Sequence, residues 1–164
     1  MNAGDRFIVG LLFFLFSATA ITASSVHVEG LYCDTGPFRL SLPKTVDALR
    51  KIGPLKNDRL LQTFRWGDNT ESQRRELEFD GLSLVIHADS SGHRYSVDSA
   101  TISSPRWSVA PNFKVGDQMN DVLQRLGLSS VPPDQLVFEG DTDSVSFDVE
   151  QDRIQQIRIR CYTG

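Results

Sequence analysis

Two histidines and an aspartate lie close together near the middle of the chain. His87, Asp89 and His93 offer imidazole nitrogens and a carboxylate, the groups that bind zinc or act as a general base with an orienting partner. Their spacing does not match H-E-x-x-H or another established ligand pattern. The same residues also fit a polar hairpin whose histidines flank a Ser-Ser-Gly tip. We therefore expect no catalytic residue, no metal and no cofactor, and keep an enzyme using this cluster as a third hypothesis.

A row of carboxylates occurs on one expected strand. Glu76, Glu78 and Asp80 alternate with apolar residues, and a pair of carboxylates can hydrolyse glycosides. Such alternation is, however, typical of the solvent face of a half-buried strand. The Asp-Thr-Asp sequence at 141–143 lacks the glycine and the closing glutamate of a calcium loop, so it predicts a turn. The sequence contains neither a Gly-x-Ser-x-Gly elbow nor a phosphate-binding glycine loop.

Aromatic and basic residues are the better candidates for binding. Tryptophan and arginine are enriched at the energetic centres of protein–protein interfaces. One tryptophan opens the polar loop 67–74, the other lies in the connector 103–111, and the last strand would carry a basic, aromatic row on its open face. The plainer alternatives are that both tryptophans close the ends of the core and that the row is ordinary polar surface. The candidate binding residues are Trp66, Asp68, Trp107, Arg158, Arg160 and Tyr162.

The first 23 residues have the three parts of a secretory signal peptide. Arg6 precedes an apolar run at 7–16, and the small residues Ala18-Thr19-Ala20 follow. The run is too short to span a bilayer, which needs about 20 apolar residues. We expect cleavage near Ala20 or Ala23, leaving one periplasmic or secreted domain, 24–164, without a stable membrane anchor. Its oligomeric state does not follow from the sequence.

Two cysteines, Cys33 and Cys161, lie near opposite ends of that domain. In an oxidising compartment such a pair predicts one structural disulfide, and the C-x-x-C spacing of redox or metal sites is missing. The formal net charge of −4 argues against a nucleic-acid partner, which would favour a basic surface. The partner that we expect is another protein, an enzyme or a toxin in the envelope.

Hydrophobic spacing predicts two amphipathic helices. In the second, Asp117 would cap the helix, apolar residues recur at helical spacing from Met119, and Gly127 would end it. The first, within 41–53, would begin near Ser41 and end at Gly53. Strands are expected after the first helix at 60–66, 75–79, 82–87 and 95–103, and after the second at 136–139, 144–149 and 154–162. The Asp80-Gly81 pair predicts a tight hairpin turn.

The shared order of elements predicts a tandem repeat. An offset of about 74 residues aligns the two terminal glycines, giving repeat 1 at about 38–104 and repeat 2 at about 113–162. The expected fold is therefore α+β: two helix-plus-antiparallel-meander repeats, with the helices on one face of an antiparallel sheet. The other sheet face would remain open to solvent.

The second repeat resembles the SmpA/OmlA group of small envelope proteins, and the architecture resembles the β-lactamase-inhibitor-protein-like fold. The similarity lies mainly in 114–159, and its residues are Val115-Gly116-Asp117, Asp121-Val122-Leu123, Leu126-Gly127, the strand at 144–148 and Arg153-Ile154-Gln155-Gln156-Ile157. The resemblance implies a sheet and loops that bind other proteins without performing chemistry.

These observations together favour an exported, non-enzymatic protein-binding module. An inhibitor of an extracytoplasmic enzyme, or an immunity-type protector against a toxin, fits the size, the acidity and the leader. The alternative that the resemblance suggests is an assembly or structural factor of the envelope.

Overall fold

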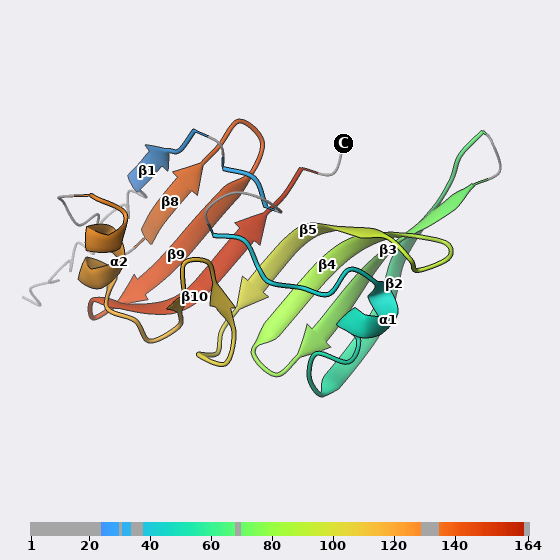
Figure 1. The fold of residues 1–164 in the computed structure, drawn as a ribbon, viewed down its shortest axis with the longest axis horizontal. Helices are drawn as coiled ribbons and strands as arrows, with labels where there is room; N and C mark the ends of the chain where they lie inside the picture. The colour runs from blue at the N-terminus through green and yellow to red at the C-terminus, as the bar shows by residue number, and fades with distance from the viewer. Residues whose placement is uncertain (1–23, 30, 34–37, 68–69, 129–134, 163–164) are drawn as a thin grey trace, which may run out of the picture.

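The computed structural model describes residues 24–29, 31–33, 38–67, 70–128 and 135–162. Its main feature is one eight-stranded sheet with the order β1-β8-β9-β10-β5-β4-β3-β2, beside a two-stranded sheet formed by β6 and β7 (Figure 1). The helices are α1 Val46–Leu49 and α2 Met119–Arg125. The strands are β1 Ser24–His27, β2 Leu55–Arg65, β3 Glu71–Phe79, β4 Leu82–Asp89, β5 Tyr95–Ile102, β6 Ser108–Val109, β7 Phe113–Lys114, β8 Gln135–Glu139, β9 Ser144–Glu150 and β10 Arg153–Arg160.

One face of the large sheet is buried and the other is open. On β4 the residues alternate strictly between buried and half-buried, as period-two side-chain placement requires. Its buried residues, Leu82, Leu84, Ile86 and Ala88, face the core. The two neighbouring strands place buried residues beside them, since Leu84 pairs with Leu77 of β3 on one side and with Ala100 of β5 on the other. The half-buried side chains therefore share the open face.

Irregular chain covers much of the buried face. Phe38 packs on Phe138 with the ring centroids 4.9 Å apart, and Phe113 and Phe147 complete a cluster in which the centroids of neighbouring rings lie within 6.5 Å. Two of the four rings come from the large sheet and two from the segments laid over it. Figure 1 shows the segment that precedes α1 and the β6–β7 hairpin crossing in front of the sheet. Aromatic burial of this kind contributes much of the core's hydrophobic stabilisation.

The expected α+β repeat is wrong. The described residues are 52% strand and 9% helical, and eight of their strands form one mixed sheet because β1 runs parallel to β8. The two groups of strands are joined directly by β10 and β5, with Ile157 opposite Ile102. Alternating hydrophobicity shows which residues of a strand are buried, but not which strands pair across the chain. The expected repeats therefore do not exist as helix-plus-meander units.

The two helices are also shorter than their hydrophobic spacing predicts. The residues before α1 are extended, and Thr45 caps it by accepting a 3.3 Å hydrogen bond from the Ala48 N–H. For α2 the cap is Gln118, because Asp117 is held in a turn by the Lys114 and Ile154 N–H groups. Apolar residues of both expected helices are nevertheless buried. They are Val46 and Leu49 in α1 and Met119, Val122 and Leu123 in α2. Within the described residues no helix is long and apolar enough to cross a membrane.

Two local expectations are confirmed. Cys33 and Cys161 form a disulfide with their Cα atoms 5.8 Å apart. The turn at Asp80-Gly81 joins β3 to β4, with Phe79 opposite Leu82. Gly81 has a φ of +72°, a conformation that glycine adopts without a steric penalty. The expected leader, residues 1–23, lies outside the described residues.

Candidate functional site

An aromatic row lies on the open face of the sheet near the β2–β3 connection. We use this name for Trp66, Phe64 and His87. Phe64 stacks on His87 with the ring centroids 5.1 Å apart and on Trp66 with the centroids 6.5 Å apart. The Ser72 hydroxyl lies beneath the row, where it accepts a 3.2 Å hydrogen bond from Trp66 Nε1 and shares a 2.6 Å hydrogen bond with His87 Nε2. These hydrogen bonds orient the Trp66 and His87 rings, and Phe64 stacks on both.

Trp66 is the most accessible member of the row. It is 55% exposed, whereas Phe64 and His87 are half-buried. A large ring that remains exposed while its orientation is fixed loses little conformational entropy on binding. Its indole offers apolar area, as the central residues of protein interfaces do. The arrangement therefore suits contact with a partner surface.

Trp107 lies elsewhere and has a structural role. Its Nε1 donates a 2.8 Å hydrogen bond to the Asp80 carbonyl, and its ring packs on Phe79 with the centroids 6.0 Å apart. The Arg106 guanidinium stands 5.6 Å from the centre of the indole. Trp107 therefore closes the core beside the β3–β4 turn, at the opposite end of β3 from Trp66. The two tryptophans do not form a common site, and Asp68 lies outside the described residues.

The histidine–aspartate cluster does not assemble. His87 belongs to the aromatic row, whereas the Asp89 carboxylate accepts hydrogen bonds from the Ser91 hydroxyl at 2.8 Å and from the His93 N–H at 3.1 Å. The Ser91 hydrogen bond is the main reason that the pKa of Asp89 is below its usual value. Asp89 thus stabilises the β4–β5 turn. The described residues hold no group of three or more His, Cys, Asp or Glu side chains that could bind a metal.

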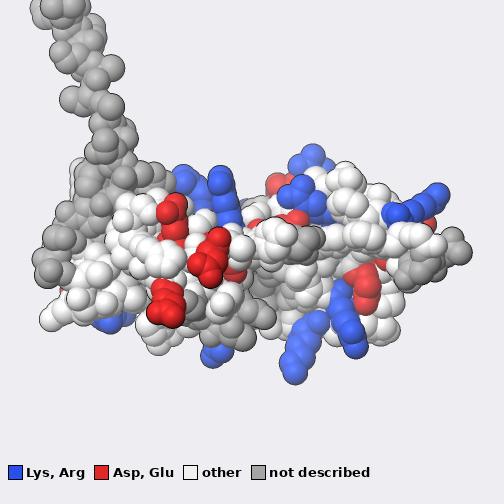
Figure 2. All heavy atoms as spheres, turned by 90° about the horizontal axis from the view of Figure 1, so that it is seen from above, with Lys and Arg blue, Asp and Glu red and all other residues white. Residues whose placement is uncertain are grey.

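The acidic row takes part in ion pairs along the sheet. Glu76 accepts from Arg59 at 2.5 Å, and this contact raises the pKa of the arginine. Asp80 lies 2.7 Å from the Lys56 ammonium, whose hydrogen bond lowers the pKa of the carboxyl. In Figure 2, lysine and arginine side chains project from both broad sides of the molecule, beside acidic ones. The visible surface therefore has no single basic face.

The basic row on β10 is shorter than expected. Arg158 and Arg160 project from the open face, where they stand opposite Thr101 and Ser99 of β5. Arg158 is occupied by an ion pair with Asp148 and a 2.7 Å hydrogen bond to Gln156. Arg160 is exposed. Tyr162, which is 69% exposed, lies beyond the end of β10 and lines a pocket, so it does not continue the row.

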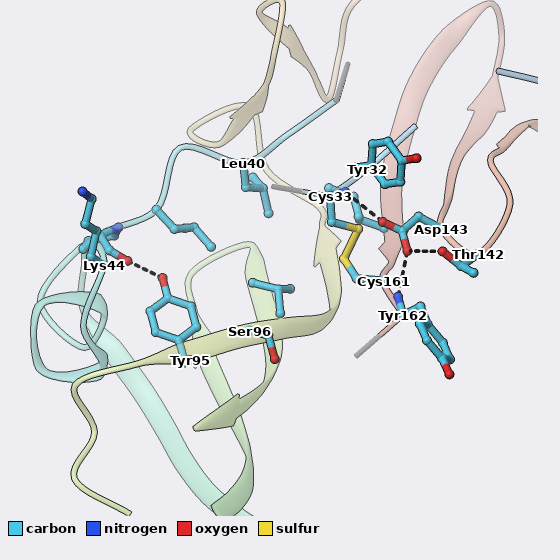
Figure 3. Close-up of a pocket in the computed structure, with 14 residues that line it drawn as sticks. Tyr32, Cys33, Leu40, Lys44, Tyr95, Ser96, Thr142, Asp143, Cys161 and Tyr162 are labelled. Atoms are coloured by element: carbon cyan, nitrogen blue, oxygen red, sulfur yellow. Dashed lines mark hydrogen bonds between the residues drawn. A yellow bond between two sulfur atoms is a disulfide. The ribbon is translucent and has the colours of Figure 1, made fainter. Parts of the chain in front are cut away.

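A pocket of about 630 Å³ opens beside the disulfide, where β5 and β10 separate (Figure 3). The two strands pair only as far as Ser99 and Arg160. In Figure 3, the side chain of Lys44 points away from the disulfide and from the tyrosines that are labelled. The pocket is lined by Tyr32, Cys33, Leu40, Leu42, Pro43, Lys44, Tyr95, Ser96, Val97, Thr142, Asp143, Ile159, Cys161 and Tyr162.

Two polar groups hold the chain around this pocket. The Asp143 carboxylate accepts backbone hydrogen bonds from Cys33 at 2.9 Å and from Tyr162 at 2.8 Å, on either side of the disulfide. The Tyr95 hydroxyl donates to the Pro43 carbonyl, and burial raises the pKa of Tyr95 to about 12. Sequence reasoning assigned Asp143 to a turn and missed this role. The Asp-Thr-Asp pattern alone contains no signal that the last aspartate is buried.

Comparisons of the chain with protein-family models, with curated proteins and with solved structures found no match. The candidate site consequently depends on the geometry described above.

Proposed function

We propose that this protein is an exported, non-enzymatic domain that binds another protein in the periplasm or outside the cell, with Trp66 as the central contact. The observation that carries the proposal is that Trp66 is 55% exposed while its ring stacks on Phe64, which in turn stacks on His87. Energetic centres of protein interfaces are enriched in tryptophan and are often preorganised. An inhibitor or an immunity-type protector is the subclass that we favour.

Export is the second part of the proposal. The disulfide is typical of an oxidising compartment, and the first 23 residues have the composition of a signal peptide. A binding role is further supported by how the polar candidates are used. Asp89 is taken up by a turn, and His87 by stacking and a serine contact. Asp89 and His87 are therefore held by separate structural contacts, and they do not surround a shared reacting centre.

The test is affinity capture from periplasmic extract with the wild-type protein and a Trp66→Ala variant as baits. A partner that the wild type retains is purified, and its affinity for both forms is measured by calorimetry. Loss of a central contact of at least 2 kcal/mol weakens binding about 30-fold. Trp66→Ala should therefore weaken binding by that factor, while the far-UV circular dichroism spectrum stays unchanged because the ring is mostly exposed.

The matched control is Tyr162→Ala. Tyr162 is also an exposed aromatic side chain, at 69%, but it lies beside the disulfide and outside the aromatic row. The Tyr162→Ala variant should bind with an affinity within about threefold of the wild type, because substitutions away from an interface change binding little. A partner that binds Trp66→Ala as tightly as wild type, or the capture of no partner at all, contradicts the proposal.

A further inference from the structure

We propose that the edge strand β2 pairs antiparallel with β2 of a second copy of the chain, which joins two sheets across a two-fold axis. β2 is the last strand in the sheet order, and in the described part of the chain no strand pairs with its outer side. With 11 residues it is also the longest of the strands that the structure describes. An edge of this kind presents a row of backbone N–H and C=O groups that can accept another extended segment.

The charges that usually protect an edge strand are occupied within the chain. Edge lysines and arginines normally discourage pairing because a second strand would have to desolvate them. Here each charged side chain of β2 contacts an oppositely charged group of its own chain. The pairs are Lys56–Asp80 at 2.7 Å, Asp58–Arg50 at 2.9 Å, Asp58–Arg75 at 2.8 Å, Arg59–Glu76 at 2.5 Å and Arg65–Glu71 at 2.7 Å. The edge is therefore close to electrically neutral.

Exposed apolar side chains concentrate on the same strand. Leu55, Leu60 and Leu61 are 36%, 48% and 38% exposed, and they are three of the six exposed large hydrophobic residues that the structure describes. Leu60 is the central residue of the strand Leu55–Arg65. Antiparallel pairing about that centre places Leu60 against Leu60 of the second copy, at the ~5 Å spacing of cross-strand neighbours. A strand with a neutral edge and an apolar centre is complementary to itself. We therefore infer that the strand pairing with β2 comes from a second copy of the chain.

The geometry closes the assembly at two copies. The opposite edge of the sheet is β1, which has only four residues, so a second long edge is missing from the described sheet. Register shifts next to Lys56 and Leu61 interrupt the ladder of β2 with β3, and such bulges increase local twist, which opposes indefinite stacking. Identical surfaces paired about a two-fold axis form a closed dimer. A single strand pair is a small interface, so we expect a dissociation constant on the order of 1–100 μM.

Sedimentation velocity of the purified chain over a range from ~1 μM to ~1 mM, which brackets that constant, tests the inference. The wild type should shift from monomer to dimer as its concentration rises. Leu60→Lys brings two ammonium groups together at the axis and should weaken dimerisation at least ~10-fold. Because Leu60 is half exposed, the variant should still fold, and its thermal unfolding verifies this.

Tyr162→Lys is the matched control, since it adds the same charge at an exposed aromatic residue away from β2. It should dimerise as the wild type does. A second edge variant, Leu61→Lys, should follow Leu60→Lys. The inference is overturned by a wild type that remains monomeric throughout the range, by an unchanged dimer in Leu60→Lys, or by growth beyond two copies.

Discussion

At the scale of single residues, Asp143 is the side chain whose removal should be most costly outside the apolar core. It is only 7% exposed, and its carboxylate accepts the N–H groups of Cys33 and Tyr162. Asp143→Ala removes the shared acceptor of two partly buried hydrogen bonds. A hydrogen bond to a charged acceptor contributes about 1.5–3 kcal/mol, and solvent reaches part of this site, so we expect the free energy of unfolding in urea to fall by about 2–4 kcal/mol.

Two further substitutions at this turn separate the hydrogen bonds from the charge. Asp141→Ala removes an exposed carboxylate from the same turn and should change the free energy of unfolding by less than about 0.5 kcal/mol. Asp143→Asn keeps one acceptor oxygen and should lie between the two. Equal stability of Asp143→Ala and Asp141→Ala would show that the two backbone hydrogen bonds do not stabilise the fold.

At the scale of elements, short-range patterns predict strands and turns well. The alternation of Val145 and Phe147 with polar residues predicts a strand at 144–149, and β9 is Ser144–Glu150. Helices are predicted less well, because apolar spacing indicates which face is buried but not how far the helix continues. The segment preceding α1 is extended because Leu40 bridges to Val109 and the Pro43 carbonyl accepts from Tyr95. These are contacts with distant residues, which local spacing does not contain.

The β3–β4 turn gives a sharp prediction at this scale. A Cβ added at Gly81 would lie 2.1 Å from the Ser104 Cβ, and φ there is +72°. Gly81→Ala must therefore displace the chain after β5 as well as strain the turn. We expect the free energy of unfolding to fall by about 2 kcal/mol or more, since positive-φ strain and a backbone clash add. Urea unfolding followed by circular dichroism measures the change.

Gly67 supplies the control for this substitution. A Cβ at Gly67 meets nothing within 4 Å, and the residue follows the exposed end of β2. Gly67→Ala should be neutral or slightly stabilising, because alanine restricts the unfolded chain. If Gly81→Ala were as stable as Gly67→Ala, the chain after β5 would be able to move away from the turn without loss.

At the scale of the whole molecule, the pairing of distant strands could not be predicted from the sequence. The pairing of β10 with β5 and the parallel pairing of β1 with β8 depend on how all strands pack over one core. The same limit applies to the candidate site. Trp66 and Trp107 both lie near the ends of strands and next to arginines, yet one remains exposed and the other closes the core. Only the tertiary packing, and not the residue types, separates them.

The disulfide is the covalent constraint that acts on the whole chain. Cys33 and Cys161 are 128 residues apart, and closing so long a loop restricts the unfolded ensemble by up to ~5 kcal/mol in the chain-entropy description. Reduction should therefore lower the free energy of unfolding by several kcal/mol, ~3–5, in urea titrations with and without dithiothreitol. A Cys33→Ser/Cys161→Ser variant should match the reduced wild type and be insensitive to the reductant. Equal unfolding midpoints in both redox states would show that the disulfide contributes no net stability. The proposed export predicts in addition that protein recovered from the periplasm contains no free thiol, because disulfides persist in an oxidising compartment.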